Sequence, residues 1–418
     1  MEQPAPDPGG ALDARRRWRR WWLALLALPW QRRAPHPPRL SSARPLRVLA
    51  IRPDHLGDLL LATPALALLR TACPAAEITA LVGPWARPVL DGRTEVDVVR
   101  TCAFPGFARG QPVGGLARLP HTPLAPYAQL LYEALRLRQT RYDVALVLRV
   151  DHWWGAALAA YAGIPVRLGY AVPESRPFLT HALPPDFAQH SVWENWRVVT
   201  ALLALLGRPV PLAEPPPVRA TVPPAGRAQA AALLAAHGVP AGARLLAIHP
   251  GTGAAVKHWS VPGWAAVADA LATRLAAQVV VTGSTEERTL VNAVVAAMRQ
   301  PAIAAAGQLD WHGLAGLFAR CAVVLGVDSG PLHLAAALGV PTVHLFGPTA
   351  PARFGPWGLG PRHRVVRAGL ACSPCGNLLR PPCGELVEPA CMRALQPEQV
   401  VAAALAALAA PEEAEVPA

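Results

Sequence analysis

The chain has almost no lysine: among its 418 residues only Lys257 is one, so the other 39 − 1 = 38 basic residues are arginine. Arginine does not replace lysine where a compact point charge is needed, which makes Lys257 a candidate functional residue. The alternative is that one lysine remains by chance. Charged residues are also scarce, at 16%, whereas 52% of the residues are hydrophobic. This composition excludes a disordered chain, and the length predicts two domains.

Acidic residues are too few to balance the basic ones, and the net charge is +12. Residues 1–47 hold ten arginines and three acids, or +7, which leaves +5 for the rest of the chain. A nucleic-acid-binding protein usually carries its basic surplus on the folded body, so we expect no nucleic-acid partner. The seven cysteines are an odd number and four lie near the C-terminus, which does not fit a secreted disulfide framework.

A membrane-spanning run is missing from the basic N-terminal extension, residues 1–45. Its apolar stretch, residues 23–30, is about half of the roughly 20 residues that cross a bilayer, and no signal-peptide cleavage site follows it. On a helix, Trp18, Trp22 and Leu25 would share a face flanked by arginines, which is typical of an interfacial anchor. We therefore expect residues 15–33 to bind an anionic membrane surface from the cytoplasm, at the inner face of the cell membrane. The alternative is a basic tail without a partner.

From residue 46 onward, short apolar runs alternate with helical patterns, as is typical of an α/β protein with parallel strands. We expect strands at residues 47–51, 78–82, 96–100, 144–148, 245–249, 279–282, 323–326 and 342–346, and helices at 59–70, 193–206, 227–237, 261–276 and 332–338. The proline-rich segment 208–226 predicts a linker. It would separate a Rossmann-like domain at 46–207 from a second one at 227–410, with a disordered tail at 411–418.

Two glycine-containing turns in the second half follow predicted strands. The first, Pro250-Gly251-Thr252-Gly253, precedes Lys257 and is not a Walker A loop, but it offers a diphosphate backbone amides, a hydroxyl and a cation. The second, Asp328-Ser329-Gly330-Pro331, opens a helix whose unpaired N–H groups and dipole favour a phosphate. Either turn alone is compatible with an ordinary helix cap. Together in one α/β domain, they predict a ligand site beyond the carboxyl ends of the strands.

The first half carries Arg52-Pro53-Asp54-His55-Leu56-Gly57-Asp58 directly after the first predicted strand. Gly57 permits a close backbone approach, and Asp58 would stand at a helix start. A carboxylate there could take a proton from an acceptor hydroxyl, although a plain helix N-cap is an equally available interpretation.

These motifs, taken in order, resemble glycosyltransferase family 9, the ADP-heptose:lipopolysaccharide heptosyltransferases and their relatives. The resemblance runs from about residue 46 to 408 and also includes Thr63-Pro64, Lys257-His258-Trp259 and Gly347-Pro348-Thr349. It implies the GT-B architecture, two Rossmann-like doubly wound domains with the active site in the cleft between them. The acceptor would bind the N-terminal domain and the nucleotide-sugar donor the C-terminal one.

The resemblance also implies roles for single residues. Asp58 would be the catalytic base, Thr252 and Lys257 diphosphate contacts, and Glu287 a ribose contact, with Glu286 as a neighbouring alternative. The remaining donor-site residues would be Asp328, Ser329, Gly330 and His333. The reaction would invert the anomeric centre, and since no metal-binding Asp-x-Asp is present, we expect no divalent metal and no required cofactor.

The substrates follow from the family only by default: heptose from ADP-heptose, and a lipopolysaccharide-like or other cell-surface glycan acceptor. The alternatives are a family 9 enzyme with a non-heptose donor and a non-lipopolysaccharide acceptor, or a sugar-nucleotide binding or scaffolding protein without turnover. We expect a monomer. One departure from the family pattern is Arg149-Val150-Asp151-His152-Trp153-Trp154, whose tryptophans would form either a sugar-stacking or lipid-facing surface or part of the core.

Four cysteines near the C-terminus remain: Cys372, Cys375, Cys383 and Cys391. Four thiols that include a Cys-x-x-Cys pair could form a structural zinc site in the segment 372–391. The pair could instead be redox-active, or all four could be free thiols.

Overall fold

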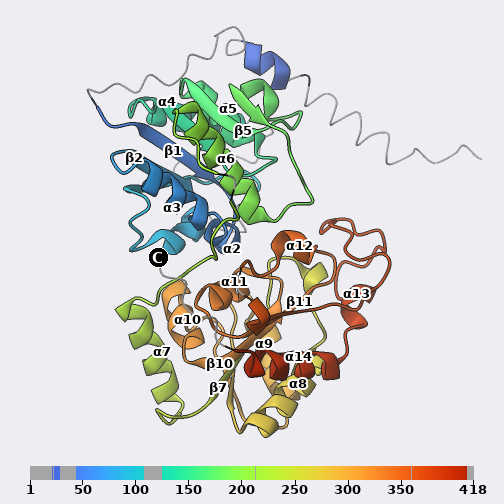
Figure 1. Ribbon diagram of the computed structural model, residues 1–418. Coiled ribbons are helices and arrows are strands. Elements are labelled where there is room, and N and C mark those ends of the chain that lie inside the picture. The colour runs from blue at the N-terminus through green and yellow to red at the C-terminus, as the bar shows by residue number, and fades with distance from the viewer. Residues whose placement is uncertain are drawn as a thin grey trace, which may run out of the picture. The chain divides into compact units, whose positions relative to one another are not determined.

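The computed structural model describes residues 21, 23–28, 44–107, 125–211, 213–358 and 360–411. They fall into two units, each built on a six-stranded parallel sheet (Figure 1). The first unit holds residues 65–186, 193–214 and the described part of 1–55. The second holds the described residues from Pro215 onward together with Leu56–Pro64 and Phe187–Val192. The expectation of an α/β protein with parallel strands is confirmed.

The sheet of the first unit has the order β3-β2-β1-β4-β5-β6. Its strands are β1 (Arg47–Arg52), β2 (Glu77–Val82), β3 (Val98–Thr101), β4 (Val144–Val147), β5 (Val166–Tyr170) and β6 (His181–Leu183). The helices along this half are α2 (Leu56–Leu60), α3 (Thr63–Ala72), α4 (Ala125–Arg138), α5 (Trp153–Tyr161) and α6 (Ser191–Leu205), with 3₁₀ helices η1 (Pro84–Leu90) and η3 (Arg176–Phe178). The central strands are buried along nearly their whole length, since helices cover both faces of such a sheet.

The single helix expected at residues 59–70 is wrong, because the chain forms two helices there. A turn at residues 61–62 separates α2 from α3. Pro64 has no backbone N–H to continue the helical bonding to Leu60, and the Thr63 hydroxyl donates to the Leu60 carbonyl oxygen instead, at 2.8 Å. Pro64 is tolerated where it lies, in the first turn of α3.

The sheet of the second unit has the order β12-β11-β10-β7-β8-β9. Its strands are β7 (Leu245–His249), β8 (Gln278–Val281), β9 (Ala302–Ala304), β10 (Cys321–Val327), β11 (Thr342–Leu345) and β12 (His363–Val366). The helices are α7 (Pro224–Ala236), α8 (Val261–Leu275), α9 (Arg288–Ala297), α10 (Trp311–Phe318), α11 (Gly330–Ala337), α12 (Pro351–Phe354), α13 (Ala390–Arg393) and α14 (Pro397–Ala409), with 3₁₀ helices η4 (Ala255–Lys257) and η5 (Gly360–Arg362). In both sheets, strand order reverses beside the first strand, as in the Rossmann arrangement.

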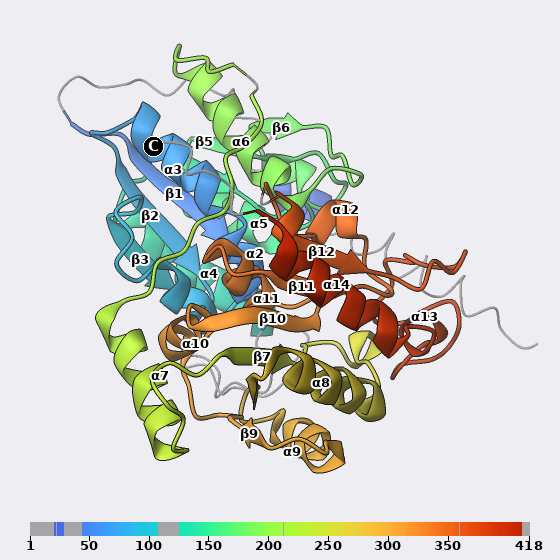
Figure 2. The same cartoon turned by 60° about the horizontal axis from the view of Figure 1, so that its bottom comes forward.

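Alternate strand residues build the core of the second unit. Leu246 and Ile248 of β7 and Val323 and Leu325 of β10 face the same side of the sheet, where they join the apolar faces of α8, α9 and α14. Figure 2 shows α8 and α14 side by side, which agrees with their direct contact. On the other face, α10 and α11 contact the sheet, and α7 packs on α10.

Several element boundaries differ from those expected. The helix α7 begins at Pro224, inside the segment 208–226, because proline fits the first turn of a helix. The strand expected at 96–100 is β3 at Val98–Thr101. The strands β5, β6, β9 and β12 were not foreseen; each is only three to five residues long.

The N-terminal extension is described at residues 21 and 23–28, which are helical, and at its last two residues, 44 and 45. Leu23 and Ala27 are fully buried in the core cluster of the first unit, and the Tyr161 hydroxyl donates to the Leu26 carbonyl oxygen at 3.0 Å. Trp18, Trp22, the arginines of the segment 15–33 and residues 412–418 lie outside the described residues. None of the described helices is both long and apolar enough to cross a membrane.

Candidate active site

The topology of the second sheet brings Lys257 and Asp328 together. Strands β7 and β10 are neighbours, and the loops at their carboxyl ends lie at the point where strand order reverses. Lys257 Nζ donates to the backbone oxygen of Asp328 at 2.6 Å and lies 3.2 Å from its Oδ2 atom. Thr252 Oγ1 donates to the same backbone oxygen at 3.4 Å. A hydroxyl, a largely buried ammonium group and a carboxylate thus meet at this edge of the sheet.

The start of α11 adds unsatisfied donors to this cluster. The hydroxyl of Ser329, its N-cap residue, is buried and has no hydrogen-bond partner among the described residues. The N–H groups of the first turn carry the positive end of the helix dipole. Such a helix start binds anions, phosphate above all.

His333 faces Asp328 from the next turn of α11. Its Nε2 atom lies 3.8 Å from Asp328 Oδ1. Burial lowers the pKa of His333 below its ordinary value, although the Asp328 carboxylate opposes this effect. The imidazole is therefore neutral near pH 7, and Lys257 supplies the positive charge of this cluster.

A second polar group surrounds Glu287, at the end of β8 and the start of α9. Glu287 accepts a hydrogen bond from the Ser284 backbone N–H at 2.8 Å and lies 3.8 Å from His249 Nε2. His249 Nδ1 in turn is 3.0 Å from Thr282 Oγ1. The carboxylate occupies the space above Gly251, where an added Cβ would lie 2.2 Å from Glu287 Oε1. Glu287 therefore faces the glycine turn, whereas its neighbour Glu286 is exposed.

The helix carrying Asp58 packs on α11. A Cβ added to Gly57 would lie 2.8 Å from Gly330 Cα and 3.1 Å from His333 Cδ2. The two helices can approach so closely only because both contact positions are glycine. Asp58, in the first turn of α2, directly follows Gly57, which contacts the start of α11. The residues at 56–64 belong to the second unit for the same reason, although they follow β1 in the chain.

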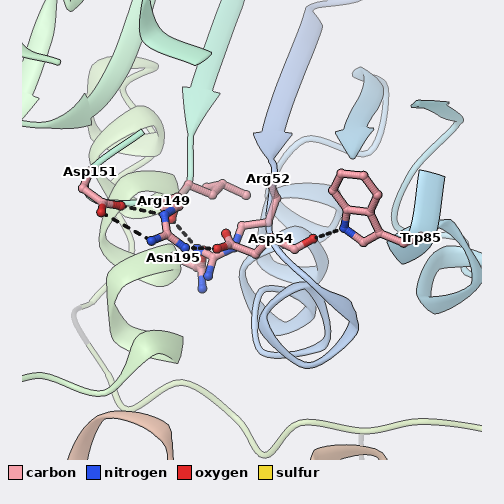
Figure 3. Close-up of polar contacts among 7 residues, drawn as sticks. Arg52, Asp54, Trp85, Arg149, Asp151 and Asn195 are labelled. Atoms are coloured by element: carbon pink, nitrogen blue, oxygen red, sulfur yellow. Dashed lines mark hydrogen bonds and ion pairs between the residues drawn. The ribbon is translucent and has the colours of Figure 1, made fainter. Parts of the chain in front are cut away.

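An ion network, buried at Arg52 and Asp54 and open to solvent at Asp151, holds the segment that leads to α2, and Figure 3 shows its side chains. Arg52 Nε lies 2.8 Å from Asp54 Oδ2, and Arg52 Nη1 donates to Asn195 Oδ1 at 3.0 Å. Arg149 pairs with Asp54 from the end of β4 and with Asp151 at 2.6 Å. Burial by itself would raise the pKa of Asp54, but the charges of Arg52 and Arg149 together hold it below its ordinary value. The network ties the chain after β1 to the chain after β4 and to α6.

The tryptophans after β4 have different surroundings. Trp154 is 2% exposed, and its Nε1 atom donates to the Pro126 carbonyl oxygen at 3.0 Å. Trp154 is thus a core residue, which excludes a sugar-stacking role for it. Trp153 is half-buried and tilts against Tyr127, with ring centroids 6.1 Å apart.

The four C-terminal cysteines are free thiols in the second unit. Cys391 is buried, Cys375 is half-buried, and Cys372 and Cys383 are exposed. Within the described part of the chain, no three His, Cys, Asp or Glu side chains already stand in a metal-binding arrangement.

The candidate donor residues named from the sequence therefore fall into two adjoining groups on one edge of one sheet. Glu287 belongs to the second group. The first group consists of Thr252, Lys257, Asp328, Ser329, Gly330 and His333. His249 and Thr282 were missed. Their positions at the carboxyl ends of β7 and β8 were the available signal, because polar side chains there face the ligand edge of such a sheet.

Two parallel α/β units of this topology constitute the GT-B fold of glycosyltransferases. A family 9 glycosyl transferase from Veillonella parvula superposes with a TM-score of 0.71 at 24% identity, covering 87% of this chain and 97% of that one. The Escherichia coli ADP-heptose lps heptosyltransferase II gives a TM-score of 0.65 at 22% identity, covering 87% of this chain and 98% of that one. At these identities the likeness establishes the fold alone.

Residues 133–380, more than half of the chain, match the model of glycosyltransferase family 9 (heptosyltransferase). The chain belongs to this family. Lipopolysaccharide heptosyltransferase 3 of E. coli is 27% identical over 312 residues, which cover 72% of this chain and 83% of that protein. Lipopolysaccharide heptosyltransferase 2 of Salmonella typhimurium is 26% identical over 332 residues, covering 77% and 88%.

Proposed function

We propose that this glycosyltransferase moves a heptosyl group from ADP-heptose to a lipopolysaccharide-type acceptor. The family and the names of its relatives support this reaction. The observation that carries the proposal is the cluster of Lys257, Asp328 and the unpartnered Ser329 hydroxyl at the start of α11. It offers one cation and several hydrogen-bond donors to a diphosphate.

In the proposed reaction, the diphosphate of the donor lies against Thr252, Lys257 and the first turn of α11. His333 and Gly330 complete this side of the site, and Glu287 accepts a hydrogen bond from the ribose. As the bond between the anomeric carbon and the phosphate oxygen breaks, ADP leaves with the electron pair and gains negative charge. Lys257 and the helix dipole stabilise that charge, so the step needs no divalent metal. Added Mg²⁺ should not raise the rate.

We assign the general base to Asp58. It removes the proton of the acceptor hydroxyl while the oxygen attacks the anomeric carbon from the face opposite ADP, which inverts that centre. The glycine contact between α2 and α11 supports this assignment, because it joins the helix of Asp58 to the helix that would bind the diphosphate.

The test is heptosyl transfer from ADP-heptose to a purified acceptor, measured as ADP release and as product mass. Asp58→Asn should lower kcat by about 10²–10⁴-fold, since it keeps the shape but not the basicity of the side chain. ADP should raise the Tm of this variant as it does that of the wild type. Asp91→Asn, the same exchange at an exposed site, serves as the control.

Other outcomes of that experiment would replace the proposal. Near wild-type turnover of Asp58→Asn would remove Asp58 from the base role. Transfer from a different sugar nucleotide, found in a Tm screen, would indicate a non-heptose donor. Binding without turnover of any donor would indicate a binding protein.

We also propose that the active species is a monomer. Size-exclusion chromatography of the active enzyme tests this expectation.

We further propose that the enzyme works at the inner face of the cell membrane through its N-terminal helix. Leu23 and Ala27 bind this helix to the first unit, so its opposite side is presented to the surroundings. Trp21, Leu25 and Leu28, spaced four and three residues apart, are 56%, 37% and 44% exposed. An exposed apolar ridge within an arginine-rich sequence suits an anionic lipid surface.

Co-sedimentation with vesicles tests this part of the proposal. The protein should bind vesicles containing anionic lipid more strongly than neutral ones, and the binding should weaken as salt is raised. Leu25→Ser should reduce binding several-fold because it removes apolar area from the ridge. Leu135→Ser, at an exposed position of α4, should not. Equal binding to neutral vesicles, or none to either, would contradict it.

A further inference from the structure

The long segment between β12 and α13 has few buried apolar side chains compared with the rest of the second unit. Residues 367–389 contain neither helix nor strand. Three of their large apolar side chains point outward: Leu379, Leu386 and Val387 are 86%, 55% and 59% exposed. Loops of this length without secondary structure are uncommon in compact domains and usually functional. A segment with so small a core of its own requires another source of order.

The four C-terminal cysteines line one cavity within this segment. Cys372, Cys375, Cys383 and Cys391 surround a space of about 30 Å³, and the remaining lining is apolar, chiefly proline with Val256 and Ala390. The thiols come from separate points of the segment and from α13. Hydrophobic packing does not explain why four thiols line a space the size of one ion, because three of the four cysteines are not buried.

We propose that these four cysteines bind a single thiolate-preferring metal ion, zinc in the first instance, that orders the segment 367–391. Four thiolates are a complete tetrahedral ligand set for zinc, and the apolar lining contributes no competing oxygen ligand. Each thiol releases one proton to solvent as the ion binds, so the site gains four metal–sulfur bonds and loses four protons. All four thiols already line one cavity, so metal binding would draw together groups that are close in the fold.

The position of this site connects it to the donor loops. Val256, which lines the cavity, precedes Lys257 in η4. The Ser373 hydroxyl donates to the Gly347 carbonyl oxygen, and the Gly376 N–H donates to the Pro348 carbonyl oxygen at 2.8 Å. A Cβ added to Gly347 would lie 3.1 Å from Cys391 Sγ. The metal would therefore support the loop after β11 and the segment that carries Lys257.

The experiment is elemental analysis of the full-length protein, purified in reducing buffer without a metal-binding tag. We expect about one zinc per chain. Cys375→Ser and Cys383→Ser should each lose most of the metal, whereas Cys321→Ala, in β10 of the same unit, should retain it. Cobalt introduced in place of zinc should show thiolate charge-transfer absorption, which reports sulfur ligation independently of enzyme activity.

Wild-type protein provides a test that does not depend on the folding of variants. Removal of the metal by a chelator should lower the Tm, and its return should restore it. Stoichiometric iron instead of zinc would keep the thiolate site and change only the ion. Protein free of stoichiometric metal, retention of the metal in both serine variants, or a disulfide between these cysteines seen by mass spectrometry would overturn the proposal.

Discussion

At the scale of single residues, Lys257 is the side chain whose chemical type matters most. Its ammonium group fits between the backbone oxygen and the carboxylate of Asp328 and is only 14% exposed. Lys257→Arg keeps the charge but places a larger planar group in that space. We expect kcat/KM for the donor to fall on the order of ten-fold, equivalent to about 1.4 kcal/mol. Arg320→Lys, the reverse exchange at an exposed position, should leave donor kinetics unchanged, and equal kinetics in Lys257→Arg would mean that charge alone suffices.

At the scale of elements, the contact of α2 with α11 depends on two glycines. Gly57→Ala would place a methyl group 2.8 Å from Gly330 Cα, closer than backbone atoms tolerate. Since the neighbour is backbone, one helix must move, at a cost of about 1–3 kcal/mol. We expect a lower Tm together with slower transfer, because Asp58 moves with α2. Gly242→Ala is the matched control, since its Cβ would meet nothing within 4 Å; an unchanged Gly57→Ala enzyme would show that α2 and α11 are not held in contact.

At the scale of the whole molecule, buried neutral histidines make stability depend on pH. Burial lowers the pKa of His190 and of His363 to about 4. His190 Nδ1 accepts from the Val192 N–H at 3.2 Å while Nε2 lies 3.0 Å from the Gly355 carbonyl oxygen, so only the neutral ring satisfies both contacts. The unfolded chain, with histidine pKa values near 6.5, binds protons that the folded chain excludes. The free energy of unfolding should therefore be constant above about pH 6.5 and fall between there and pH 4.

The slope of that decline is about 1.4 kcal/mol per pH unit for each such histidine. Urea unfolding at pH 7.5 and 5.5 and constant ionic strength measures it. His190→Gln retains a donor and an acceptor but does not titrate, so it should show a smaller decline. Equal stability of the wild type at both pH values would mean that these rings are protonated in the folded protein.

The sequence was most informative where a strand runs into a glycine turn. The turns around Thr252, Lys257 and Asp328 each combine strand periodicity with residues whose backbone freedom or charge suits a phosphate, so both the element and the candidate residues could be named. His249 and Thr282 were missed because neither belongs to a motif; only their positions at the carboxyl ends of two neighbouring strands pointed to them. The break between α2 and α3 had a local signal in Pro64, which lacks the N–H that would continue a helix. The Thr63 hydroxyl that takes the place of this N–H becomes visible only in three dimensions.

The alternation of strands and helices and the doubly wound class can be derived from the sequence alone, because the hydrophobic period and the glycine turns are local properties. Tertiary structure alone decided which residues meet. Lys257 and Asp328 lie 71 positions apart and touch because β7 and β10 are neighbours in the sheet. Trp154 lies in the core of the first unit. The four C-terminal cysteines, although they are spread along the chain, line one cavity. Contacts between distant residues follow from strand order and packing, which no local pattern contains.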